Sequence, residues 1–119
     1  MGNPFSIFLA LLIFASTAYG YVQINFYWDS NCGEYAGSTT IQNPTDDYKW
    51  NYNGQSALIA NCEISGGNNH CTIGLSWTGH FVAQLDADNG HVSSCAKTPI
   101  QEDGLSVTDI QFQSFCHNC

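Results

Sequence analysis

Four histidines and ten acidic residues are the side chains of this 119-residue chain that could take part in hydrolysis. A hydrolase needs a histidine with a carboxylate and a nucleophile, or two carboxylates across a cleft. The candidates are His70, His80, His91, His117, Asp86, Asp88, Glu102 and Asp103. Nearly all lie in turn-like segments, where polar residues are expected anyway, and no HExxH or nucleophile-elbow signature is present. We therefore expect no catalytic residues and no enzyme activity.

Cys116 and Cys119 form a C-x-x-C pattern around His117, which could belong to a redox or zinc site. A redox pair usually begins a helix, whereas a strand-like segment precedes this one. Structural zinc takes four ligands, and the chain has no second C-x-x-C. The pattern therefore favours a structural disulfide, with no metal and no cofactor.

Three tryptophans and six tyrosines could form a surface that stacks against sugars. In a domain this small, aromatic side chains also supply much of the buried core. We expect Trp50 in the core, whereas Trp77, which lies close to Gly79, is the better candidate for an exposed binding residue.

The segment Tyr48–Ala60 organises the expected fold. Tyr48, Trp50 and Tyr52 alternate with polar residues, so they share one face of a strand. Asn-Gly at 53–54 is typical of a type I′ turn, and a small, apolar run follows it. The pattern predicts a β-hairpin with one buried face.

Other segments alternate or end in turn formers in the same way, and none has a convincing helical period. The expected strands are 21–28, 35–41, 72–77, 81–85, 92–95 and a last strand within 105–115; residues 43–47, 86–90 and 98–104 are expected as turns or loops. Seven or eight short strands predict an all-β sandwich or barrel.

The first twenty residues carry no charge and contain an apolar run, Phe5–Ala15, of the length of a signal-peptide core. Small residues at 18 and 20 predict cleavage after Gly20. We expect residues 1–20 to be a signal peptide and residues 21–119 to form one secreted domain. Six cysteines then indicate three disulfides, for which fifteen pairings are possible.

The net charge of −8, with two lysines and no arginine, disfavours nucleic acid as a partner, because phosphates are bound by clustered cations. It also disfavours capture by anionic lipid. We expect a monomer that does not insert stably into membranes.

The order of these features resembles a known group of small secreted proteins. A first strand ends in Asp29-Ser30-Asn31-Cys32, Tyr48-x-Trp50-x-Tyr52-x-Gly54-Gln55-Ser56-Ala57 follows, and a last strand ends at Cys116. The order is similar to that of macadamia-type plant antimicrobial proteins, which have a βγ-crystallin-like fold. Yeast killer toxins, fungal secreted effectors and a bacterial metalloproteinase inhibitor share that fold. The resemblance implies two Greek keys packed as a two-sheet sandwich.

The resemblance also implies a pairing of Cys32 with Cys95. Cys62 with Cys71 would form a local bridge, leaving Cys116 with Cys119, although a crossed pattern among these last four stays open. Crystallin keys often bind calcium, and the two weak candidate segments here include Asn68, Asn69, Asp88 and Asn89.

The function that the resemblance implies is that of a non-catalytic effector, antimicrobial or killer-toxin-like protein. The acidic charge departs from the basic plant proteins and weakens a membrane-directed role. Two alternatives are a protease inhibitor, using an exposed loop at Gly66–His70 or Pro99–Gly104, and a carbohydrate- or calcium-binding module.

Overall fold

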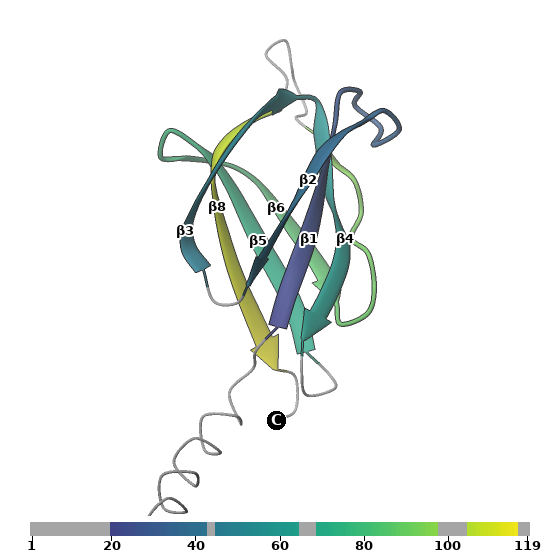
Figure 1. Cartoon of the computed structure of the whole chain (residues 1–119), viewed down its shortest axis with the longest axis vertical. Helices are drawn as coiled ribbons and strands as arrows, with labels where there is room; N and C mark the ends of the chain where they lie inside the picture. The colour runs from purple at the N-terminus through teal and green to yellow at the C-terminus, as the bar shows by residue number, and fades with distance from the viewer. Residues whose placement is uncertain (1–19, 43–44, 65–68, 98–104, 117–119) are drawn as a thin grey trace, which may run out of the picture.

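The protein folds as two four-stranded antiparallel sheets that pack face to face (Figure 1). This computed structural model describes residues 20–42, 45–64, 69–97 and 105–116, which contain eight strands and no helix. The strands are β1 (Gly20–Tyr27), β2 (Tyr35–Gln42), β3 (Thr45–Gly54), β4 (Ser56–Ile64), β5 (Asn69–Trp77), β6 (His80–Asp88), β7 (Ala96–Lys97) and β8 (Leu105–Cys116). The prediction of an all-β, two-sheet domain is confirmed.

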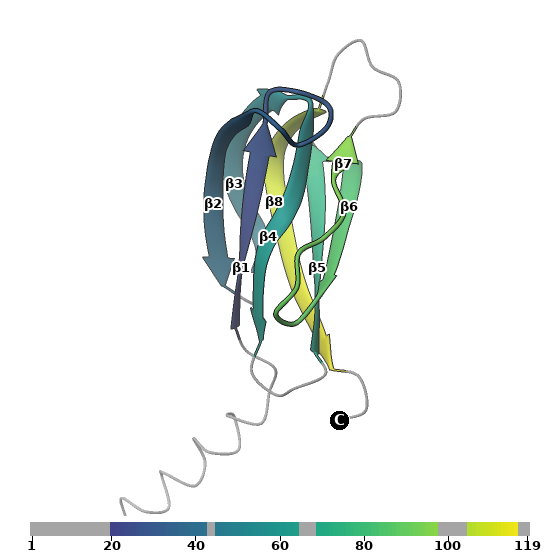
Figure 2. The ribbon, with the colours of Figure 1, turned by 90° about the vertical axis from the view of Figure 1, so that its right-hand side faces the viewer.

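The third and seventh strands, β3 and β7, each lie in the sheet opposite to that of their neighbours in the sequence. The first sheet has the order β2-β1-β4-β7 and the second has the order β3-β8-β5-β6. Each half of the chain thus gives three strands to one sheet and one strand to the other. Figure 2 shows β1, β2 and β4 in one layer, with β8 and β5 in the layer behind.

The core lies between the sheets and follows from the alternation of apolar residues. In β1, Val22, Ile24 and Phe26 are fully buried, as their spacing predicted. The second sheet contributes the opposite wall of the core through alternate residues of β5, β6 and β8. Its buried members are Cys71, Ile73, Leu75, Leu85, Ala87, Val107, Ile110 and Phe112.

The prediction of a hairpin over residues 48–60 is wrong. The two strands do form, but β3 pairs with β8, whereas β4 pairs with β1 and β7. Gly54 lacks the positive φ of a type I′ turn, because the chain passes here from one sheet to the other. Glycine is required at position 54 for a different reason, which is lack of space for a side chain. A Cβ on Gly54 would collide with the Tyr52 hydroxyl and the Tyr27 carbonyl oxygen.

The Tyr52 hydroxyl stabilises the connection between β3 and β4, where the chain passes from one sheet to the other. It accepts a hydrogen bond of 2.9 Å from the N–H of Gln55, and it lies against the carbonyl oxygens of Tyr27 and Ser56. The Tyr52 ring packs against Phe26, with centroids 4.6 Å apart. Burial is the main cause that raises the pKa of Tyr52. One aromatic side chain therefore joins the two layers.

Two disulfides match the expected pairings: Cys32–Cys95, which the resemblance implied, and the local bridge Cys62–Cys71. Cys32–Cys95 joins the loop after β1 to the segment before β7, and Cys62–Cys71 joins β4 of one sheet to β5 of the other. A crossed pattern that uses Cys62 or Cys71 is thereby excluded. The side chain of Cys116 and all of Cys119 lie outside the described residues.

Some boundaries differ from the prediction. Residues 45–47 belong to β3 and 86–88 to β6, so both expected loops are shorter, and only Asn89-Gly90 makes the turn after β6. The short strand expected at 92–95 forms instead at Ala96–Lys97. Isolated turn formers such as Asp and Asn were overridden by pairing with neighbouring strands.

Candidate functional site

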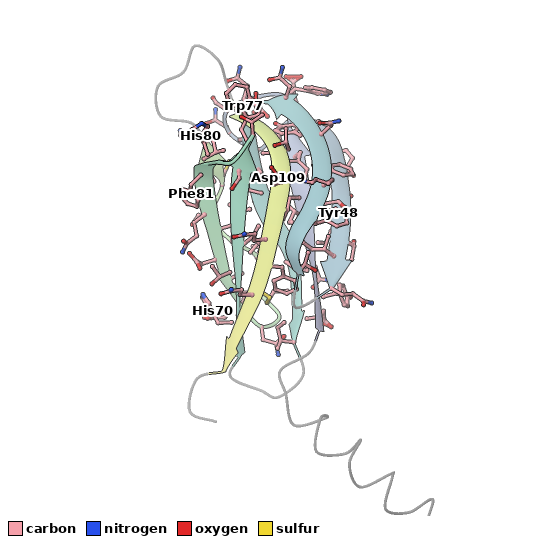
Figure 3. All side chains as sticks on the ribbon, turned by 90° about the vertical axis from the view of Figure 1, so that its left-hand side faces the viewer. Tyr48, His70, Trp77, His80, Phe81 and Asp109 are labelled. Atoms are coloured by element: carbon pink, nitrogen blue, oxygen red, sulfur yellow. A yellow bond between two sulfur atoms is a disulfide. The ribbon has the colours of Figure 1, made fainter. Side chains whose placement is uncertain are left out.

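Trp77 stands at the end of β5, on a tight turn into β6. Its side chain is 50% exposed, which agrees with its prediction as an exposed aromatic. Thr78 and Gly79 connect the strands with φ angles of 44° and 86°, and Trp77 faces His80 across them. Two successive positive φ values are the requirement of a type I′ turn. Figure 3 shows Trp77, His80 and Phe81 together at one end of the molecule.

A series of hydrogen bonds ties this turn to β8 and β3. The N–H of Thr78 donates to Oγ1 of Thr108 (2.8 Å), whose hydroxyl donates to Asp109 (2.9 Å). The other carboxylate oxygen of Asp109 accepts from Lys49 at 2.5 Å. Lys49 is mostly exposed, so this ion pair adds little stability. The whole series links the turn after β5 to β8 and β3.

The pairing of β3 with β8 is interrupted at the same place. Lys49 faces Asp109 and Tyr52 faces Val107, so Trp50 and Asn51 together lie opposite Thr108 alone. Two residues opposite one constitute a bulge, a feature that is frequent beside functional sites. The bulge lies close to Trp77, because Asn51, Thr108 and Trp77 line the same hollow.

A surface groove follows the bulge. It consists of two hollows of about 520 and 420 Å³ that share Asn51 and Thr108. Pockets for small ligands usually measure roughly 300–1,000 Å³. We call this the Trp77 groove; its lining is Lys49, Trp50, Asn51, Tyr52, Asn53, Trp77, Thr78, Ser106, Val107, Thr108 and Asp109.

Trp50 is one of the residues that line the first hollow of the Trp77 groove. As expected, its ring packs on the core, with its centroid 5.8 Å from that of Phe26 and the two planes inclined by 22°. Its indole N–H is buried and has no hydrogen-bond partner among the described residues. A buried donor without a partner destabilises a protein by about 1–3 kcal/mol, and it is uncommon in native structures.

A second polar cluster lies near the other end of β5 and β6. His70 bonds Asp88 through Nδ1 (3.0 Å) and Asp86 through Nε2 (3.3 Å). The bond from Asp88 is the main cause that raises the pKa of His70. Burial alone would raise the pKa of Asp86, but bonds from Gln84, Thr72 and His70 lower it overall. Figure 3 shows His70 far along the sheet from Trp77.

The geometry of the His70 cluster differs from that of a hydrolytic centre. Both ring nitrogens of His70 face carboxylates, and the nearby Thr72 hydroxyl donates to Asp86, 2.8 Å away, rather than to the histidine. A general base must instead accept the proton of its nucleophile. Each ring nitrogen of His70 therefore faces a carboxylate oxygen and not the hydroxyl of a nucleophile.

The side chains of the described calcium candidates already have protein partners. Asp88 binds His70, and Oδ1 of Asn89 accepts a hydrogen bond of 2.8 Å from the N–H of Ile64. Asn68 and the side chain of Asn69 lie outside the described residues. Within the part of the chain that the structure describes, no three His, Cys, Asp or Glu side chains form a group that could hold a metal.

The proposed inhibitory loops fall mostly outside the described ranges, which omit residues 65–68 and 98–104. The same holds for the C-x-x-C pattern at 116–119. Among the described residues, no helix is long and apolar enough to span a membrane. Comparisons with protein families, curated proteins and solved structures found no match for this chain.

Trp77 was the one residue of the Trp77 groove that the sequence indicated as a binding residue. Asn51 and Thr108 were missed because they become neighbours only through the register of β3 on β8. The polar alternation of Lys49, Asn51 and Asn53 was visible, but it indicated only an exposed face.

Proposed function

We propose that this is a secreted, non-catalytic protein that acts outside the cell by binding a surface component of another organism. Its role would be that of an effector or of an antimicrobial, killer-toxin-like protein, and the Trp77 groove would be its binding site. The observation that carries the proposal is Trp77 itself. A half-exposed tryptophan is held by a fixed turn beside a polar groove.

The strand order supports a βγ-crystallin-like fold with two Greek keys. In a Greek key, the fourth strand returns to lie beside the first. β4 lies beside β1, and β8 lies beside β5. The exchange of β3 and β7 between the sheets fits two such keys packed as one domain.

Secretion is supported by the two disulfides and by the apolar segment that precedes β1. Disulfides form and persist in oxidising compartments. They also suit a domain of this size, whose core alone gives limited stability.

A non-catalytic role is supported by the way the described titratable groups are used. His70 is saturated by two carboxylates, and Asp109 by Thr108 and Lys49. The groove offers hydroxyl, amide and indole groups, which suit recognition better than acid–base chemistry.

The proposal is tested with mature protein purified from culture medium. Growth inhibition and cell death are measured on panels of fungal, bacterial and plant cells, with protein reduced and alkylated as the unfolded control. We expect an effect on at least one class of cell, and a much weaker effect from Trp77→Ala. No effect of the folded protein on any cell would overturn the proposed role.

A further inference from the structure

We infer that the Trp77 groove binds a neutral, β-linked polysaccharide of the kind found in cell walls. This inference deepens the proposed function and rests on it for the choice of site. Two properties of the groove carry it: a flat aromatic platform, and a polar lining whose two charged members are paired with each other.

The platform is Trp77. Its indole presents a broad apolar face together with a polar edge, and half of the side chain is open to solvent. Hexopyranose units joined by equatorial β-linkages expose flat faces of C–H groups, which stack on such a ring. The turn at Thr78 and Gly79 keeps the platform in place, because Thr78 is bonded to β8.

The lining of the groove matches the edges of a sugar. Asn51, Asn53, Ser106 and Thr108 supply amides and hydroxyls that can donate and accept hydrogen bonds. The charged members, Lys49 and Asp109, are bonded to each other. A ligand with many hydroxyls and no charge is therefore the best complement.

Charge excludes the other polymers that stack on aromatic rings. Single-stranded nucleic acids use such platforms but require a basic groove. This chain has a net charge of −8, which repels nucleic acids and acidic polysaccharides alike.

The first test is retention, on insoluble polymers, of mature protein purified from culture medium. The probes are a β-1,3-glucan and chitin, compared with a neutral α-linked glucan and a polyuronate. We expect retention on at least one β-linked probe and on neither comparison polymer. Trp77→Ala should weaken it about tenfold, whereas Phe81→Ala, which changes an exposed aromatic outside the groove, should leave it unchanged.

The second test is Asn51→Ala, which removes a polar group that lines both hollows without touching the core. Affinity for a soluble oligosaccharide of the retained polymer should fall about threefold to tenfold, with an unchanged thermal midpoint. Unchanged affinity would contradict a role of the polar lining in binding the sugar.

The outcomes distinguish this inference from the proposed function. An effect on cells that depends on Trp77, without retention on either β-linked polymer, would overturn the glycan inference and point to a protein target at the same site. Retention that is equal in wild type and Trp77→Ala would also overturn it. Retention without any effect on cells would support the inference and contradict the effector role.

Discussion

The N–H of Thr78 donates a 2.8 Å hydrogen bond to Oγ1 of Thr108, and this bond links the turn that carries Trp77 to the strand that lines the groove. The two residues are 30 positions apart in sequence. The platform and the lining of the groove are thus positioned by the same threonine.

Replacing Thr108 with valine keeps the side-chain shape but removes this acceptor. We expect the free energy of unfolding to fall by about 1 kcal/mol, measured by urea denaturation. Thr108→Ser, which keeps the hydroxyl, should cost less. The tryptophan fluorescence maximum of the folded Thr108→Val variant should also shift, because the turn that carries Trp77 loses this hydrogen bond. Equal stability of the Val and Ser variants would show that the bond does not anchor the turn.

Gly79 should resist substitution because of its backbone conformation alone. Its φ is +86°, and nothing lies within 4 Å of a Cβ placed there. We expect Gly79→Ala to destabilise the protein by about 1 kcal/mol. Gly37 in β2 also has open space, but it lacks a positive φ, so Gly37→Ala is the matched control and should be neutral or slightly stabilising. Thermal unfolding of both variants decides the point, and identical midpoints would contradict the assigned turn.

The two described disulfides should differ in their contribution to stability. Cys32–Cys95 closes a loop with a sequence separation of 63, whereas Cys62–Cys71 has a separation of 9. On the chain-entropy model, these bridges stabilise by about 4 and about 3 kcal/mol. The paired Cys→Ala variants are compared by denaturant unfolding. Cys62 and Cys71 are fully buried, so their removal should also create a packing defect, and the measured loss should exceed the entropic figure. No loss from removing Cys32–Cys95 would contradict this account.

The His70 cluster predicts a window of pH in which the protein is most stable. The pKa of His70 is raised above its ordinary value of 6.5, so its contribution is complete below 6.5 and is lost as pH rises through the folded pKa. The pKa of Asp86 is lowered below 3.8, so its contribution is present above 3.8 and is lost as pH falls through the folded pKa. The cluster should therefore stabilise most between about pH 4 and 6.5.

NMR titration of the His70 ring checks this directly. Wild type should titrate above 6.5, and Asp88→Asn should lower the pKa of His70, because Asp88 is the main cause of the shift. His70→Gln should flatten the dependence of the thermal midpoint on pH over the same range. A pKa of wild-type His70 at or below 6.5 would show that Asp86 and Asp88 do not bond its ring when the protein is in solution.

The inner faces of the strands could be predicted because burial acts on each strand separately. The alternation of Val22, Ile24 and Phe26 marks a buried face whatever strand lies next to it. The same holds for Trp50 and Tyr52, which pack against the core as their spacing implied.

Strand partners could not be predicted in the same way. Asn53-Gly54 is a strong local signal for a hairpin, but the interactions of Tyr52 with Gln55 and Tyr27 direct the chain into the other sheet. The Trp77 groove could not be predicted from the sequence for a related reason. It depends on the two-to-one pairing of Trp50 and Asn51 with Thr108, and that register forms only between strands far apart in sequence.

The most direct test of the central claim is the retention of labelled protein on the surface of responsive cells. Wild type, Trp77→Ala and Phe81→Ala are compared at equal concentration, after circular dichroism has shown that all three are folded. The account predicts that wild type and Phe81→Ala are retained alike and that Trp77→Ala is largely washed away. Equal retention of all three would contradict the assignment of the Trp77 groove as the binding site.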